Sequence, residues 1–166
     1  DTRSLSAWLD DTLQTARFKD YCPNGLQVEG KPTISRIIAG VTASEALLRV
    51  AIERQADAIL VHHGWFWKNE DPRVRGTRRT RLALSLQHDL NVFAYHLPLD
   101  AHPTLGNNAQ LAQVLGLTPQ RDANAAPVTC GPDSLIWLGS APGIHTLGEL
   151  SARIHSRLDR APLLIG

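Results

Sequence analysis

Two adjacent histidines, His62 and His63, follow a short apolar run over residues 57–61 and precede Gly64. Neighbouring side chains on an extended strand point to opposite faces. Two imidazoles therefore reach one small site only where the strand has ended and the backbone turns, which glycine permits. That geometry suits two metal ions, because each ring can bind its own ion. Taken alone, the doublet is more typical of a buried, hydrogen-bonded pair or of a chance repeat.

A second group of polar residues follows the next predicted strand, residues 91–95, and contains His96, Asp100 and His102. The carboxyl ends of parallel strands lie side by side in an α/β sheet, so this group and the histidine doublet converge on one edge. Carboxylates together with imidazoles bind Zn, Mn, Fe, Co or Ni. The sequence therefore predicts a metal site at this edge. His102 precedes Pro103 in a turn and is the member expected to stand outside the site.

A basic segment over residues 73–81 contains Arg73, Arg75, Arg78, Arg79 and Arg81. Guanidinium groups bind phosphate through paired hydrogen bonds, so we expect this segment, and Arg78 and Arg79 in particular, to bind the substrate. A solvated loop and helix face is the alternative interpretation. The aromatic residues 65–67 just upstream could stack a base, or could pack in the core or an interface.

The elements that must position these residues alternate between strands and helices. We expect a helix over 4–16 capped by Ser4, a loop over 18–32 with a short strand, a buried strand over 34–41, a helix capped by Thr42 or Ser44 and reaching 55, a strand over 57–61, a helix over 79–89 with Leu82, Leu86 and Leu90 on one face, a strand over 91–95, and a helix over 107–115 that stops at Gly116. This order predicts an α/β fold, a layered sheet with helices in which the strands are largely parallel.

The remainder of the chain predicts a second α/β unit related to the first. A first unit over 1–118 is followed by a Pro-, Asn- and Gly-rich linker over 119–132. Residues 133–166 then contain a predicted strand (134–138), helix (147–158) and final strand (163–165). The chain contains no methionine and stops within a segment typical of a strand entering a turn. We therefore expect a piece of a longer protein in which the second unit is only partly present.

Composition limits the function classes. The chain has 166 residues, 43% of them hydrophobic and 20% charged, which indicates a globular domain. Its formal net charge of +1 favours neither nucleic acid nor an acidic membrane as a partner. Cys22 and Cys130 do not make a secreted disulfide scaffold. We expect a cytoplasmic protein, because the sequence has neither a signal peptide nor the roughly 18 continuous apolar residues of a membrane span.

Several segments together resemble the Nif-three-like family, also known as GTP cyclohydrolase 1 type 2. They are DYCPNGLQVEG (20–30), GVTAS (40–44), ADAILVHHGWFWK (56–68), YHLPLDAHP (95–103) and LGNNAQLA (105–112). The resemblance is dense from about residue 5 to 117 and loose beyond it. It implies a subunit of two α/β units, ring-shaped homohexamers built from dimers, and a divalent dimetal centre inside the ring. It implies metal ligands at His62, His63 and Asp100, with the remaining ligands in a later His-x-x-x-Glu segment that this sequence lacks.

These observations favour a hydrolase that uses two divalent metal ions per subunit and acts on a nucleotide-like or otherwise phosphorylated small molecule. His62 and His63 would each hold one ion, and Asp100 would hold or bridge them. His96 is the catalytic candidate, which could form a hydrogen bond to a metal ligand or shuttle a proton. One alternative is a non-catalytic, ring-forming metal-binding scaffold that engages a protein or nucleic acid through residues 73–81. A metal centre that only stabilises the fold is another.

Overall fold

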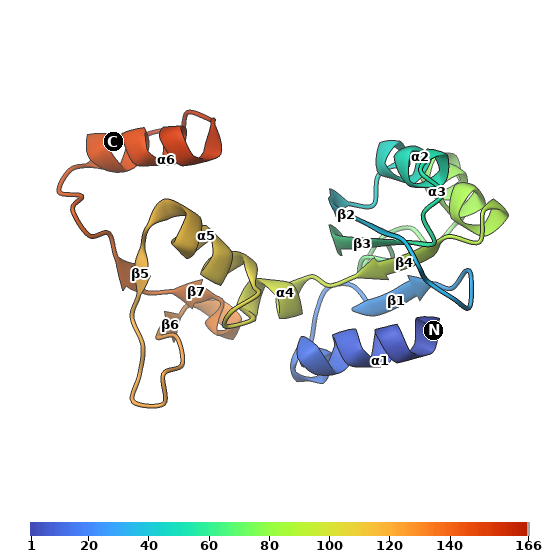
Figure 1. Ribbon diagram of the computed structural model, residues 1–166, viewed down its shortest axis with the longest axis horizontal. Helices are drawn as coiled ribbons and strands as arrows, with labels where there is room; N and C mark the ends of the chain where they lie inside the picture. Colours follow the sequence, from blue (N-terminus) through green and yellow to red (C-terminus); the bar gives the residue numbers. More distant parts are fainter. Residues whose placement is uncertain (166) are drawn as a thin grey trace. The chain divides into compact units, whose positions relative to one another are not determined.

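The computed structural model describes residues 1–165; Gly166, the last residue of the predicted second unit, lies outside the described residues. The chain forms two compact units, Asp1–Leu99 and Asp100–Gly166. The boundary expected at residue 118 therefore falls inside the second unit. Both units are mixed α/β structures (Figure 1).

The first unit is built on a four-stranded sheet with the order β1-β4-β3-β2. Its elements are α1 (Thr2–Thr12), the 3-10 helix η1 (Thr15–Arg17), β1 (Gly25–Val28), β2 (Ile37–Thr42), α2 (Glu45–Glu53), β3 (Ala58–His63), α3 (Gly76–Gln87), β4 (Asn91–Ala94) and the start of α4 (Leu97–Ala101). The strands β2, β3 and β4 are parallel, and β1 pairs antiparallel with β4. The largely parallel sheet that the sequence predicts is therefore confirmed.

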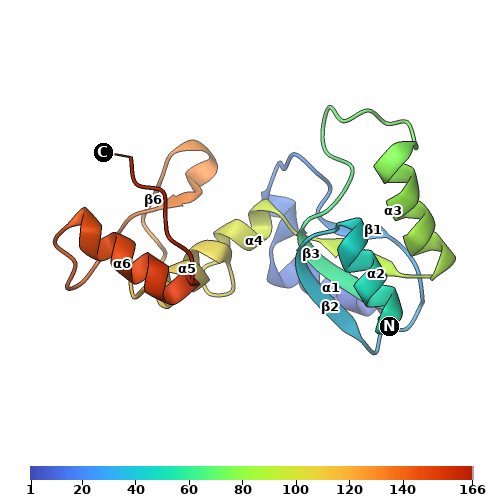
Figure 2. The same ribbon diagram turned by 90° about the horizontal axis from the view of Figure 1, so that it is seen from above.

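Helices cover both faces of this sheet, because its strands carry apolar side chains on both sides. Phe93 and Tyr95 pack on one face against Leu9 of α1 and against Leu13, which follows it. Val92 packs on the other face, in the core that α2 and α3 contribute to. Figure 1 shows α1 below the sheet with α2 and α3 above it, and Figure 2 shows α2 lying over β2 and β3. This three-layer arrangement fixes the carboxyl ends of β3 and β4 next to each other.

Three sequence predictions in this unit are wrong in detail. The strand expected to be buried over 34–41 is β2, which lies at the edge of the sheet with Val41 69% exposed. The first helix begins before Ser4, whose N–H donates to the Asp1 side chain, so that Asp1 caps α1. On α3, Leu86 is exposed rather than on the buried face. The predicted cap at Ser44 is confirmed, since its hydroxyl accepts from the N–H of Leu47.

The second unit contains shorter elements. They are α5 (Asn107–Leu115), β5 (Thr118–Pro119), β6 (Thr129–Cys130), the 3-10 helix η2 (Pro132–Ser134), β7 (Ile136–Trp137), β8 (Gly139–Ser140) and α6 (Leu147–Leu158). Antiparallel pairs form between β5 and β8 and between β6 and β7. The predicted stop at Gly116 is confirmed by its left-handed φ of 65°, and α6 has the predicted bounds.

Two expectations for the second unit are wrong. The segment expected to be a linker, 119–132, contains β6 and part of β5, and residues 163–165 form no strand.

Among the described residues, no helix is long and apolar enough to cross a membrane.

A partly exposed polar cluster joins the segment before β2 to Asp57, the residue before β3. The Asp57 carboxylate accepts hydrogen bonds from Lys31 Nζ at 2.8 Å and from the backbone N–H groups of Ser35 and Arg36 at 2.9 and 3.0 Å. The hydrogen bond from Lys31, and then those from Ser35 and Arg36, lower the pKa of Asp57 to about 2. Asp57 therefore stabilises the fold in its charged form.

Replacing Asp57 by Asn is expected to lower the free energy of unfolding at pH 7 by about 1.5–3 kcal/mol, because the charge-assisted hydrogen bonds are lost. The folded-state pKa is depressed, so the contribution of Asp57 is present above the unfolded value of 3.8 and is lost as pH falls toward about 2. Urea unfolding of both proteins at pH 7 and at pH 3 measures this difference. A destabilisation that is equally large at both pH values would contradict the role of the charge.

Candidate metal centre

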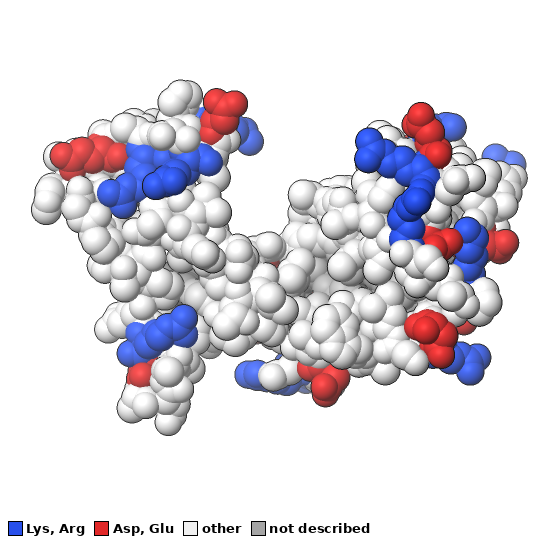
Figure 3. All heavy atoms as spheres, in the orientation of Figure 1, with Lys and Arg blue, Asp and Glu red and all other residues white. Residues whose placement is uncertain are grey.

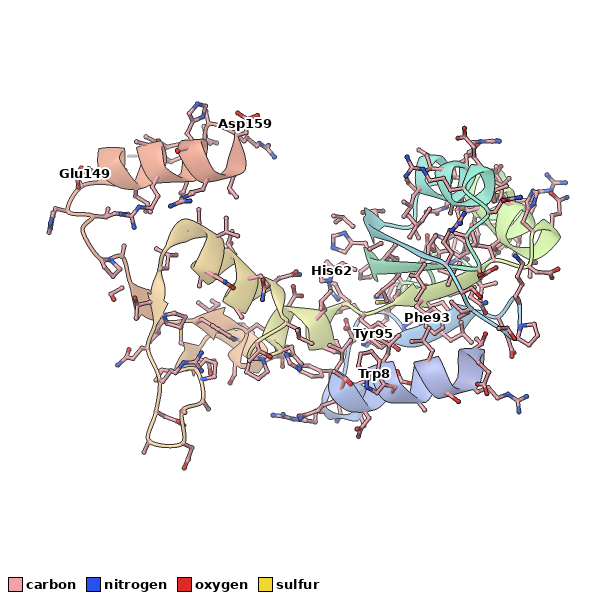
Figure 4. The ribbon with its side chains drawn as sticks, in the orientation of Figure 1. Trp8, His62, Phe93, Tyr95, Glu149 and Asp159 are labelled. Carbon is pink, nitrogen blue, oxygen red and sulfur yellow. The ribbon has the colours of Figure 1, made fainter. Side chains whose placement is uncertain are left out.

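His62 and His63 are the last two residues of β3, and their ring centroids lie 4.5 Å apart. The strand therefore does not end before the doublet, contrary to the sequence-based expectation. Pairing of β3 with β4 stops at Val61 and Ala94, whereas pairing with β2 continues to His63. Because β4 has ended by this point, the two imidazole rings have room to approach each other at the edge of the sheet. Figure 4 shows His62 at this end of the strands.

Gly64 has a different role from the one expected. It does not adopt a left-handed conformation; instead, a Cβ there would lie 2.3 Å from Gln27 Oε1 and 2.4 Å from the Cβ of Ala94. Only glycine therefore allows the chain after β3 to pass this close to β4.

His96 joins the doublet from the end of β4. Its ring centroid lies 4.9 Å from that of His62 and 5.7 Å from that of His63. One potential ligand atom of each of the three rings lies within 4.8 Å of those of the other two. Three side chains at the carboxyl ends of two neighbouring strands therefore meet, as the α/β topology predicts.

The other two members of the predicted cluster, Asp100 and His102, belong to the second compact unit. Asp100 lies in α4, and its Oδ1 accepts a hydrogen bond from Asn107 Nδ2 at 2.8 Å. His102 Nδ1 accepts from the backbone N–H groups of Thr104 and Leu105, which is typical of a side chain that stabilises a turn. The role of Asp100 as a metal ligand stays a prediction.

The tautomer of His62 follows from its partner. Its Nδ1 lies 3.1 Å from the carbonyl oxygen of Tyr95, which can only accept, so Nδ1 carries the hydrogen. Nε2 is then the nitrogen with the lone pair that a metal requires. For His63, Nδ1 lies 3.4 Å from Thr42 Oγ1, and either group can donate.

Asp20 is a functional candidate that sequence reasoning missed, although it begins the segment 20–30. Its Oδ1 accepts from His96 Nδ1 at 2.8 Å and from the N–H of Tyr21, and its Oδ2 accepts from Asn24 Nδ2 and the N–H of Leu97. Burial raises the pKa of Asp20, but these four hydrogen bonds outweigh it, and the pKa lies below its ordinary value. Asp20 is therefore a carboxylate at neutral pH.

The chemistry of the donors fits a divalent metal ion at the three histidines. Imidazole nitrogens are ligands for Zn, Fe, Co, Ni and Mn, and His62 presents one with its tautomer fixed. A second group, Asp20, Cys22 and His96, also has its potential ligand atoms within 4.8 Å. It fits less well, because burial and then the charge of Asp20 raise the pKa of the Cys22 thiol to about 11. A metal there would have to displace that proton and compete with the donors to Asp20.

The loop after Gly64 forms one wall of this centre. Gln27, a second residue that sequence reasoning missed, accepts from the N–H of Trp65 at 2.6 Å and donates to its carbonyl oxygen at 3.1 Å. Trp65 is buried in the core and donates from Nε1 to Ala43 O. Trp67 lies edge-on to His96 with their centroids 5.0 Å apart. Trp65 is therefore a core residue, and Trp67 lies beside the histidines.

The arginine segment is partly neutralised by its own acidic residues. Arg73 and Arg75 both bind the Asp71 carboxylate, and Arg78 binds Glu70 at 2.7 Å. On the face of the molecule that Figure 3 shows, blue and red atoms also lie side by side around α2. Glu70 and Asp71 directly precede the arginine segment, so this pairing could have been predicted from the sequence.

The two predicted substrate-binding arginines differ in setting. Arg78 is mostly buried and lies over the ring of Phe66, 5.8 Å from its centroid, whereas Arg79 is exposed at the start of α3. Arg79 therefore has the more accessible guanidinium group.

Replacing Gly64 by Ala is expected to lower the free energy of unfolding by about 1–3 kcal/mol, since the added Cβ overlaps Gln27 and Ala94. Urea unfolding followed by tryptophan fluorescence measures the loss. The matched control is Gly148→Ala in α6, where no atom lies closer than 3.9 Å and alanine should stabilise the helix by about 0.5–1 kcal/mol. Equal stability of the Gly64 variant and the wild type would show that the close approach is absent.

Comparison with known proteins gives consistent matches along the chain. The family model described as Duf34/NIF3 (NGG1p interacting factor 3) matches residues 1–165. A protein named GTP cyclohydrolase 1 type 2 homolog from Neisseria meningitidis is 51% identical over 164 residues, covering 99% of this chain and 63% of the relative. The protein of the same name from Escherichia coli is 48% identical, covering 98% and 62%. The chain thus spans less than two thirds of the length of these relatives.

Solved structures show the same relationship. The protein ybgI, of unknown function, aligns with a TM-score of 0.88 and 46% identity over 98% of this chain and 62% of its own. A protein from Thermus thermophilus aligns with a TM-score of 0.81 and 37% identity over 98% and 63%. Because the family model matches nearly the whole chain and relatives about half identical cover it, this chain belongs to the Duf34/NIF3 family.

Proposed function

We propose that this chain contributes to a dinuclear divalent-metal centre that hydrolyses a nucleotide-like or otherwise phosphorylated small molecule, in the manner of a GTP cyclohydrolase 1 type 2. The observation that carries the proposal is the meeting of His62, His63 and His96, with potential ligand atoms within 4.8 Å of one another. The name of the relatives, GTP cyclohydrolase 1 type 2 homolog, supports hydrolysis as the reaction type.

In this proposal, His62 and His63 would each hold one ion, and Asp100, as the family resemblance implies, would be a further ligand. Zn, Fe, Mn, Co and Ni are all compatible with imidazole and carboxylate ligands. The family resemblance implies further ligands from a later His-x-x-x-Glu segment. A ring-shaped homohexamer and a cytoplasmic location are part of the same proposal.

When bound, two divalent ions would lower the pKa of water toward neutrality and stabilise negative charge that develops in the transition state. The chain's own residues supply the proton transfer. Asp20 holds the Nδ1 hydrogen of His96, so the Nε2 of His96 can accept a proton beside the histidine doublet. The Trp67 ring lies beside His96 and His63, with centroid distances of 5.0 and 6.1 Å.

The loop after β3 provides a recess for a planar ring. It has a volume of about 240 Å³ and is lined by Phe66, Trp67, Glu70, Pro72, Val74 and Arg78. Aromatic walls favour stacking of a planar ring, and the exposed Arg79 at the start of α3 is the candidate phosphate ligand. The ion pairs made by Arg73, Arg75 and Arg78 disfavour the scaffold alternative, which needs a surface of one sign.

Replacing His63 or Asp100 by Ala is expected to abolish turnover and to reduce the bound metal from two ions per chain, because each change removes a ligand. Elemental analysis of the purified proteins and a screen of nucleotide and phosphoester substrates measure the two effects. His88→Ala, at an exposed position after α3, is the matched control and should keep both properties. Full metal content in both ligand variants would overturn the proposed site.

Replacing Arg79 by Ala is expected to raise KM by about 10-fold or more while leaving kcat and the metal content unchanged, because a phosphate contact is lost. Steady-state kinetics with the best substrate from the screen measure this. Arg49→Ala, which removes an exposed arginine paired with Glu45 on α2, controls for the loss of a surface charge. Equal KM values for the two variants would contradict substrate binding by Arg79.

A further inference from the structure

We propose that Asp20 is a positioning residue of the metal centre: it fixes the tautomer of His96, so that Nε2 is the nitrogen available beside His62 and His63. This inference deepens the proposed function and rests on it. It concerns a residue in the loop before β1, far from the histidines in sequence, which the topology brings to them.

The contact between the two side chains determines where the hydrogen lies. Asp20 Oδ1 and His96 Nδ1 are 2.8 Å apart, with the side chains only 2% and 16% exposed. A carboxylate can only accept, so Nδ1 must donate. The lone pair of a neutral His96 is then on Nε2. A carboxylate behind an imidazole also makes the opposite nitrogen more basic, whether that nitrogen binds a metal or a proton.

The carboxylate is itself held rigidly. Its four hydrogen bonds come from Tyr21, Asn24, His96 and Leu97, which lie on both sides of the contact. Asn24 also accepts from the backbone N–H of His96 at 2.7 Å. The loop over residues 20–24 is thereby fixed to the backbone at the end of β4, whereas the imidazole itself is held by Asp20.

Asp20 is the orienting group that a substitution can remove most cleanly. The Nδ1 of His62 faces a backbone carbonyl oxygen, that of Tyr95, which no substitution deletes. The Nδ1 of His63 faces Thr42 Oγ1 at the longer distance of 3.4 Å. A side-chain amide at position 20 would be nearly the same size as the carboxylate, but its NH₂ group can donate to Nδ1. That contact would favour the opposite tautomer, with the hydrogen on Nε2.

The test compares Asp20→Asn with the wild type in two measurements. Titration with Co²⁺ alone, followed by its visible absorption, is expected to show affinity about 10–100-fold weaker in the variant, as for loss of an outer-shell partner. Nitrogen-15 NMR of the metal-free proteins is expected to show the Nδ1–H tautomer of His96 in the wild type and the Nε2–H tautomer in the variant.

Asn24→Ala is the matched control, because it loosens the same loop and leaves the contact between Asp20 and His96 in place. It should bind Co²⁺ within about threefold of the wild type, and Asp20→Asn should have no further effect in a His96→Ala background. An Nε2–H tautomer in the wild type, unchanged affinity in Asp20→Asn, or an equal loss in Asn24→Ala would overturn the role of Asp20. A wild type that binds no Co²⁺ would overturn the proposed function instead, and the tautomers would still decide the role of Asp20.

Discussion

The parallel pairing of β3 with β4 is the constraint on which the candidate site depends. Its register aligns Val61 with Ala94, so the residues that follow in each strand emerge at the same edge of the sheet. His62 and His63 follow Val61, and His96 lies two residues after Ala94. Apolar packing on both faces holds this register, because a shift of one residue would move Val92 and Phe93 into the wrong layers. The chemistry of the site therefore follows from the burial of residues that take no part in it.

Hydrogen bonds to buried or backbone partners then turn this juxtaposition into defined geometry. The carbonyl of Tyr95 directs His62, and the carboxylate of Asp20 directs His96. Gln27 fixes the wall of the site by holding both backbone groups of Trp65. Gln27 lies in β1, Asp20 in the loop before it and Tyr95 directly after β4, so these partners come from the β1 and β4 half of the sheet. Low exposure strengthens these contacts, because water does not compete for the donors.

Sequence reasoning predicted the parts of this structure that depend on local patterns and on topology. The apolar runs predicted β3 and β4, and the rule for carboxyl ends of parallel strands predicted the meeting of His62, His63 and His96. It did not identify Asp20 or Gln27, whose partners lie 76 and 38 residues away and leave no periodic signal. It also mistook β2 for a buried strand, since β-branched residues are common on edge strands too. The acidic partners of the arginines are short-range and could have been read from the sequence.

Membership of the Duf34/NIF3 family and the convergence of imidazoles support one central claim, that His62 and His63 bind divalent metal ions. Anomalous diffraction from crystals grown with Co²⁺, recorded at the cobalt absorption edge, tests it most directly. The account predicts anomalous peaks about 2.0–2.2 Å from an imidazole nitrogen of each of these two histidines. Crystals whose anomalous peaks lie only at other residues, with both imidazoles ordered and without metal, would contradict it.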